Sequence, residues 1–174
     1  MCLAAKNACF KLDPSDTQIR VLTKMAEASG RCACGHIKYK VTGEPTWVAG
    51  CCCRDCARAT GTPYIVWVGF PVAAVKFQEA EPTLTETSEG VRRGFCGKCG
   101  AALTYGRDPK YDVVDPLVYI AATSFDDPDL FPPTEVVWYA QRPDWFELAG
   151  PIPLHDGVSP GQSDRAYISA LKRQ

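Results

Sequence analysis

The sequence has no long hydrophobic run and no excess of charge of one sign. No apolar stretch approaches the roughly 18 to 20 residues of a membrane-spanning helix. Lys6, Lys11 and Asp13 interrupt the N-terminus where a signal peptide would carry its apolar core. The formal net charge is −1, with acidic and basic residues well mixed. We therefore expect a cytoplasmic protein that binds neither nucleic acid nor a membrane.

Histidine is scarce and cysteine is abundant. His36 and His155 are the only two histidines, and for both we expect a structural role with a satisfied hydrogen bond. The chain has ten cysteines, and most of them are clustered. In a reducing compartment, clustered cysteines bind metal or carry out redox chemistry more often than they form stable disulfides. Metal binding is therefore the favoured interpretation.

The densest cluster places four cysteines in the segment Cys51-Cys52-Cys53-Arg54-Asp55-Cys56. Successive side chains of a strand point to opposite faces, so Cys51 and Cys53 share one face and Cys52 points to the other. Cys56 follows Cys53 at C-x-x-C spacing, which lets two thiolates bind one zinc ion. Three sulfurs thus converge without a local fourth ligand. Three protein ligands and an open position are typical of a catalytic zinc.

Two further cysteine pairs supply a second candidate site. One pair lies in Cys32-Ala33-Cys34-Gly35, and the other lies in Phe95-Cys96-Gly97-Lys98-Cys99-Gly100. Gly97 and Gly100 are expected to take the positive φ of a tight turn around a metal. Together the two pairs provide the four thiolates of a closed, structural zinc site.

The seven cysteines of these motifs also allow other interpretations. In a rival partition, positions 32 and 34 share a site with positions 51 and 53, and positions 56, 96 and 99 form the triad. Both sites could also be purely structural, because C-x-x-C pairs often only brace small folds. The sequence leaves these alternatives open.

Short β-type runs separated by turn signals cover most of the chain after residue 30. Expected strands are 37–41, 46–50, 63–70, 84–87, 91–95, 117–122 and 135–139. Helical patterns are confined to residues 54–60, which end at Gly61, and to two flanking segments, from about residue 15 to Gly30 and over 164–171. We predict an all-β domain of several small antiparallel sheets braced by zinc.

The length suits one domain with a core of its own. We assign residues 1–28 to an N-terminal extension, 29–148 to the zinc-binding domain and 149–174 to a C-terminal tail packed on that domain. Trp67 and Trp145 are expected in the core.

Three motifs together resemble the glutathione-dependent formaldehyde-activating enzyme family, which also contains the centromere protein V domain. They are Gly30-Arg31-Cys32-Ala33-Cys34-Gly35, Cys51-x-Cys53-x-x-Cys56 and Phe95-Cys96-x-x-Cys99-Gly100. The likeness spans about residues 29 to 148. It implies a fold of several small sheets, a structural zinc on Cys32, Cys34, Cys96 and Cys99, and a catalytic zinc on Cys51, Cys53 and Cys56.

The resemblance also implies an activity. The founding enzymes of the family condense glutathione with formaldehyde to S-hydroxymethylglutathione, formally a carbon-sulfur lyase reaction run in reverse. The expected partners are a glutathione-like thiol and a small aldehyde, and an oligomer is compatible with the sequence. The alternative is a non-enzymatic, zinc-braced protein-interaction module, as the centromere relatives suggest.

The resemblance bears on two further sets of residues. Glutathione carries two carboxylates, for which Arg54, Arg58, Arg92 and Arg93 are the nearest guanidinium candidates, although a solvated surface charge is the expectation for each. The chain departs from the family at Cys52, where the family commonly has a histidine between the first two cysteines of the triad.

Overall fold

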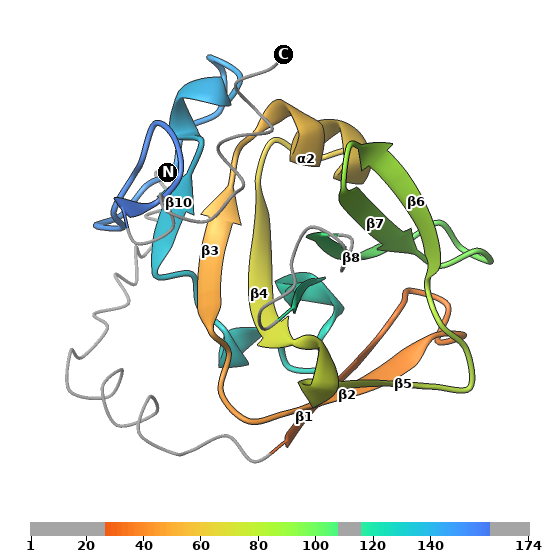
Figure 1. Cartoon of the computed structure of the whole chain (residues 1–174). Helices are drawn as coiled ribbons and strands as arrows, with labels where there is room; N and C mark the ends of the chain where they lie inside the picture. The colour runs from red at the N-terminus through yellow and green to blue at the C-terminus, as the bar shows by residue number, and fades with distance from the viewer. Residues whose placement is uncertain (1–26, 108–115, 161–174) are drawn as a thin grey trace, which may run out of the picture.

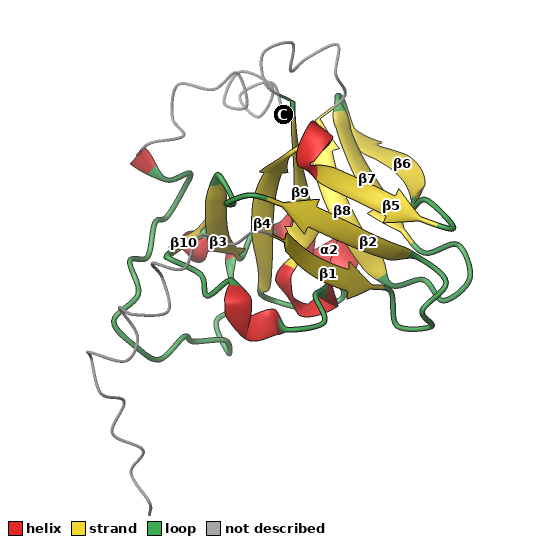
Figure 2. Ribbon diagram, turned by 90° about the horizontal axis from the view of Figure 1, so that it is seen from below, coloured by secondary structure: helices red, strands yellow, loops and turns green. Residues whose placement is uncertain are grey.

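The computed structural model describes residues 27–107 and 116–160, which form two β-sheets and one short α-helix (Figure 1). The smaller sheet has three antiparallel strands in the order β1-β2-β5, namely β1 (Glu27–Arg31), β2 (Lys38–Thr42) and β5 (Val75–Gln78). Figure 2 shows this sheet lying across the larger one. The predicted all-β class is confirmed.

The larger sheet has seven strands in the order β10-β3-β4-β9-β8-β7-β6. Its members are β3 (Trp47–Cys51), β4 (Ile65–Pro71), β6 (Thr83–Ser88), β7 (Val91–Phe95), β8 (Ala102–Arg107), β9 (Leu117–Ala121) and β10 (Glu135–Val137). All neighbours pair antiparallel except β10 and β3, which are parallel. Strand β4 is central, as its β-branched and aromatic sequence predicts.

Because side chains alternate along the strands, the larger sheet has buried residues on both of its faces. Tyr39 and Val41 of β2 are buried and alternate with exposed polar residues. They pack against Val68 and Phe70 of β4, so one core fills the space between the two sheets. The other face of the larger sheet carries Trp67 with its aromatic and cysteine neighbours. The predicted core position of Trp67 is confirmed, because only 1% of its surface is exposed.

The short elements complete the frame. Helix α2 (Arg54–Thr60) directly follows β3 and ends at Gly61, whose φ of 70° is the expected left-handed cap. The 3₁₀ turns are η1 (Val72–Ala74), η2 (Ala122–Ser124), η3 (Pro128–Leu130) and η4 (Tyr139–Gln141). Among residues 27–107 and 116–160, no helix has the length and hydrophobicity of a membrane span.

Some local predictions were wrong. Residues 27–30 belong to strand β1, where a helix was expected to continue to Gly30; the rest of that helix and the helical turn at 164–171 lie outside the described residues. Trp145 is 77% exposed, because its indole stands beside Phe146 at the surface while Phe146 itself stacks on Tyr64. An apolar residue in a loop thus gave a false core signal.

A segment after the last strand adds to the edge of the larger sheet. Val136 donates its backbone N–H to Pro153 and accepts one from His155, and Trp138 donates to Gly157. The isolated parallel bridge between Val136 and Leu154 belongs to the same ladder. Residues 153–157 therefore cover the edge that β10 would otherwise present.

We expect Gly30→Ala to destabilise the protein by about 1 to 3 kcal/mol, because the added carbon overpacks the core. A Cβ at Gly30 would lie 2.2 Å from the Tyr39 hydroxyl and 2.6 Å from the backbone oxygen of Ser124. Gly157→Ala is the matched control, since its Cβ would meet nothing within 4 Å. Urea unfolding of both variants measures the difference, and equal midpoints would contradict the packing described for β1.

Candidate metal centres

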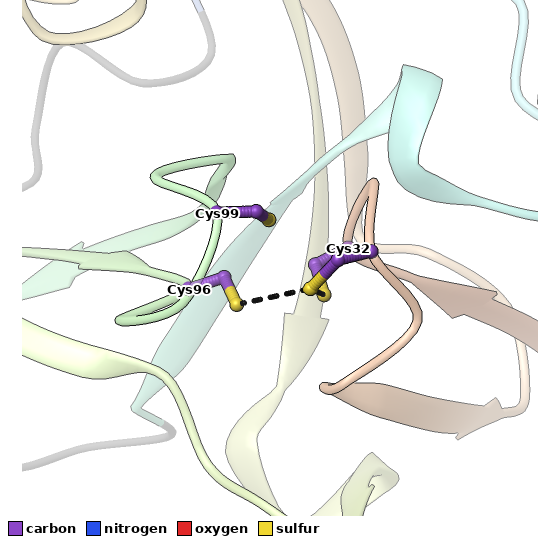
Figure 3. Close-up of side chains that lie close together, drawn as sticks. Cys32, Cys96 and Cys99 are labelled. Carbon is purple, nitrogen blue, oxygen red and sulfur yellow. Dashed lines mark hydrogen bonds between the residues drawn. The ribbon is translucent and has the colours of Figure 1, made fainter.

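Two tight turns from different sheets bring four cysteines together. Cys32 and Cys34 follow β1, and Cys96 and Cys99 lie between β7 and β8 (Figure 3). The two turns are built alike, because the N–H of Cys32 donates to the oxygen of Ile37 at 3.0 Å and that of Cys96 donates to Ala101 at 2.9 Å, five residues on in each case.

Glycines close both turns at positive φ. Gly35 has φ 71° and Gly100 has φ 73°, a region that L side chains avoid. The prediction for Gly100 is confirmed. The prediction for Gly97 was wrong, because the turn places only the glycine after the second cysteine in the left-handed region.

The four sulfurs fit a tetrahedral metal site. All four lie within 4.8 Å of one another, with Cys34 3.5 Å from Cys32 and 3.8 Å from Cys96. Zinc–sulfur bonds of about 2.3 Å in a tetrahedron require sulfur–sulfur separations of about 3.8 Å. The donor set and its spacing therefore suit a closed thiolate site that would tie the smaller sheet to the larger one.

Burial divides these four thiols into two pairs. Cys32 and Cys96 are buried, whereas Cys34 and Cys99 are exposed. Burial alone would raise the pKa of Cys32, but the N–H of Ile37, 3.2 Å from the sulfur, and the neighbouring thiols lower it to about 6. The inner sulfur is thus prepared to be a thiolate, which is the form that binds metal.

The second cluster forms where β3 passes into α2. Cys51 is the last residue of β3, Cys53 caps the helix by accepting the N–H of Cys56 at 3.3 Å, and Cys56 lies in the first turn. Their sulfurs also lie within 4.8 Å of one another. The structure therefore groups the seven thiols as four and three, and the rival partition is not the one it adopts.

Cys52 stands apart from both clusters. It is 1% exposed, and its N–H donates to the oxygen of Val137 at 3.1 Å, so the strand alternation that separates it from Cys51 and Cys53 holds. Burial raises the pKa of the Cys52 thiol, while the charge of Arg142 opposes that rise. This thiol is a neutral core group.

Three N–H groups from the larger sheet point at Cys56. The indole Nε1 of Trp67 lies 3.4 Å from the sulfur, and both terminal nitrogens of Arg93 lie 3.8 Å from it. The pKa of Cys56 falls far below its usual range, through hydrogen bonds from Cys51 and Cys53 first and then through Arg93 and Trp67, against the effect of burial. Of the three thiols, Cys56 is the first to become a thiolate.

The sheet register explains how Arg93 reaches this place. One row of register partners crosses five strands, from Arg93 through Tyr105, Tyr119 and Gly69 to Trp47. Partners opposite one another share a face. Tyr105 and Tyr119 stack at 4.6 Å, and the missing side chain of Gly69 lets Trp47 meet Tyr119 edge-on at 5.6 Å. An aromatic floor thus lies under the three-cysteine cluster.

The expectation of a solvated surface charge was wrong for Arg93, which is half-buried against Cys56. Arg54 and Arg58 are exposed as expected, and Arg58 lies 3.7 Å from Asp55 in an ion pair. Arg92 is exposed too. The burial of Arg93 could have been predicted from the alternation in β7, which puts Arg93 on the same face as the apolar Val91.

Neither histidine belongs to a cysteine cluster among the residues described. His155 Nε2 lies 3.0 Å from a carboxylate oxygen of Glu135, whose other oxygen accepts the indole N–H of Trp47 at 2.6 Å. The expected satisfied hydrogen bond is therefore present for His155.

One comparison with known proteins agrees with the cysteine pattern. The family profile described as "Glutathione-dependent formaldehyde-activating enzyme" matches residues 27–141. A crystal structure of a Rhodobacter sphaeroides protein is similar, with 18% identity, a TM-score of 0.47, and coverage of 72% of this chain and 98% of that one. No curated protein matches the chain.

Removing a sulfur from the four-cysteine cluster should loosen the link between the sheets. We expect Cys96→Ala to lower the melting temperature by roughly 10 °C, because a structural zinc site contributes several kcal/mol and each kcal/mol shifts the melting temperature of a domain this size by about 2 to 4 °C. The chelator TPEN should lower the native protein's melting temperature at least as much and the variant's by clearly less, because the variant has only the three-cysteine site left to lose. A native protein indifferent to chelation would contradict the bracing role.

Proposed function

The chain belongs to the glutathione-dependent formaldehyde-activating enzyme family, and we propose that it is a zinc-dependent enzyme of the carbon-sulfur lyase type. In this proposal, it adds a thiol such as glutathione to formaldehyde or a related small aldehyde. Cys51, Cys53 and Cys56 form the catalytic metal site. The four-cysteine cluster holds a second, structural zinc.

One observation supports the proposal above the others, namely that the three-cysteine group lacks a fourth donor. Over residues 27–107 and 116–160, no further histidine, cysteine, aspartate or glutamate side chain joins it. A closed structural site would need that fourth ligand, whereas three protein ligands leave a position for a reactant. The neighbouring cluster, with its four thiols, provides the contrast within the same chain.

The chemistry of the donors agrees with this assignment. Soft thiolate ligands bind zinc in preference to hard cations such as magnesium. A zinc ion held there would supply a deprotonated, oriented substrate thiol and would polarise an aldehyde oxygen. Three thiolate ligands make a metal electron-rich, so the site favours a bound sulfur nucleophile over the activation of water.

The surrounding residues shield most of the cluster from water. Cys51 and Cys56 are buried, with Trp67 and Tyr105 packed beside them, while Cys53 is half-buried. We therefore place the entry of thiol and aldehyde on the side of Cys53. The carbon–sulfur bond forms between the substrate's sulfur and the aldehyde carbon, and the aldehyde oxygen takes up the proton released by the thiol.

The competing function is a protein-interaction module in which both zinc ions only brace the fold. A fourth protein ligand at the three-cysteine site or a fully buried triad would favour it. The three-membered donor set is the feature that favours the enzyme, since the burial of the three thiols fits either function.

Metal content separates the two neighbouring cysteines. We expect two zinc ions per native chain, one in Cys53→Ala, because the triad loses a ligand, and two in the matched control Cys52→Ala, whose thiol lies outside the cluster. Native mass spectrometry of the folded proteins gives the count. Loss of an ion from Cys52→Ala, or retention of both ions by Cys53→Ala, would contradict the assignment of ligands.

Activity is tested with glutathione and formaldehyde. Exchange NMR of the zinc-loaded native protein should show formation of S-hydroxymethylglutathione faster than in the protein-free mixture. Cys53→Ala should return the exchange rate to the uncatalysed value, and Cys52→Ala should keep most of the native rate. If the native protein gives no acceleration with glutathione or with other small thiols, the enzymatic proposal is wrong and the interaction module remains.

A further inference from the structure

Strand β7 carries two adjacent arginines with different surroundings. Arg92 is exposed, whereas Arg93 is half-buried on the face of the sheet that carries Tyr105, its register partner in β8. The two side chains bear the same charge and are adjacent in sequence. Substituting each in turn therefore distinguishes a change in net charge from the loss of a positive charge beside Cys56.

The guanidinium of Arg93 is held in place by three kinds of contact. Its Nε donates to the hydroxyl of Thr87 at 3.2 Å, and its central carbon lies 5.6 Å from the centroid of the Tyr105 ring. Both terminal nitrogens then face the sulfur of Cys56 at 3.8 Å. A planar guanidinium fixed at its Nε and on its face loses little freedom when its fork meets a thiolate.

The N–H donors are unevenly distributed over the three sulfurs. Cys56 receives Arg93 and the indole of Trp67, while Cys53 receives the backbone N–H of Cys56. A hydrogen bond to a thiolate is strengthened when the donor is charged. Outer partners of this kind orient metal ligands and tune the ion that they hold.

The formal charge of a zinc-bound triad explains why a cation beside Cys56 would matter. Three thiolates and one divalent zinc carry one excess negative charge, and a substrate thiolate as fourth ligand doubles that excess. Burial amplifies the repulsion, because the effective dielectric constant beside the aromatic floor is far below that of water. One fixed positive charge at Cys56 cancels the excess before the substrate enters.

We propose that Arg93 is a positioning residue of the three-cysteine site, where its guanidinium compensates the excess negative charge through Cys56 and so favours an anionic thiol as the fourth ligand. This inference rests on the proposed function and extends it to the charge of the substrate. Arg93 does not need to touch the reactants to act in this way.

The experiment uses the full-length protein loaded with Co²⁺, whose sulfur-to-metal charge-transfer absorption changes when a fourth thiolate binds. Titration with glutathione gives a dissociation constant independent of turnover. We expect Arg93→Met to weaken glutathione binding roughly 10- to 100-fold, the usual range for such outer partners. Arg93→Lys should fall between this variant and the native protein, because it keeps the charge and loses the fork. Arg92→Met, the matched control, should bind as the native protein does.

Two results would overturn the inference. One is Arg93→Met binding glutathione within a factor of about three of the native protein, against the range expected for an outer partner. The other is an equal loss in Arg92→Met, which would show an unspecific effect of net charge. If Arg93→Met fails to fold, Thr87→Val provides a second test, since it frees the guanidinium of Arg93 and keeps its charge. Thr87→Val should weaken glutathione binding several-fold. Native affinity in both Thr87→Val and Arg93→Lys would reject the positioning role of Arg93.

The outcomes also separate this inference from the proposed function. A native protein that binds cobalt in the triad but no thiol rejects both. A native protein that binds glutathione and catalyses its exchange with formaldehyde, beside an Arg93→Met variant that binds equally well, rejects only the role of Arg93.

Discussion

The convergence of sulfur atoms from separate turns is the constraint on which the rest of this molecule depends. The turn after β1 and the turn between β7 and β8 are 64 residues apart at Cys32 and Cys96, yet their sulfurs belong to one group within 4.8 Å. They join a three-stranded sheet to an edge region of a seven-stranded one. With that joint closed, the two sheets enclose the core of Tyr39, Val68 and Phe70, and the other face of the larger sheet is left to build a second site.

That second site depends on the two-residue period of strands at both ends of the sheet. At the end of β3, the extended chain puts Cys51 on the same side as Cys53 and leaves Cys52 buried apart from them. In β7, it puts Arg93 on the side of Tyr105 and leaves Arg92 exposed. Helix α2 then bends the chain back over this face, so that Cys56 meets Trp67 and Arg93 from strands that are distant in sequence.

Local chemistry made much of this predictable from the sequence. C-x-C and C-x-x-C spacings, the short helix ending at Gly61 and the buried run of β4 depend on neighbouring residues, and they were found where expected. Alternation in β7 indicates the face on which Arg93 lies, but its partners across that face depend on the register of five strands, which no local pattern encodes. The prediction for Trp145 was wrong because its hydrophobicity suggested burial, whereas its loop holds it at the surface.

In the proposed function, the two clusters use the same ligand for opposite purposes. Four thiols saturate a tetrahedral ion and leave it inert, which suits a joint between sheets. Three thiols leave one position open, and the charge that they concentrate would repel an anionic reactant unless it were balanced. In the proposed role, Arg93 would balance that charge without occupying the open position, because its guanidinium contacts a ligand sulfur rather than the metal. The number of sulfur ligands thus decides whether a site has an open position for a reactant. The residues that contact those sulfurs decide which reactant it favours.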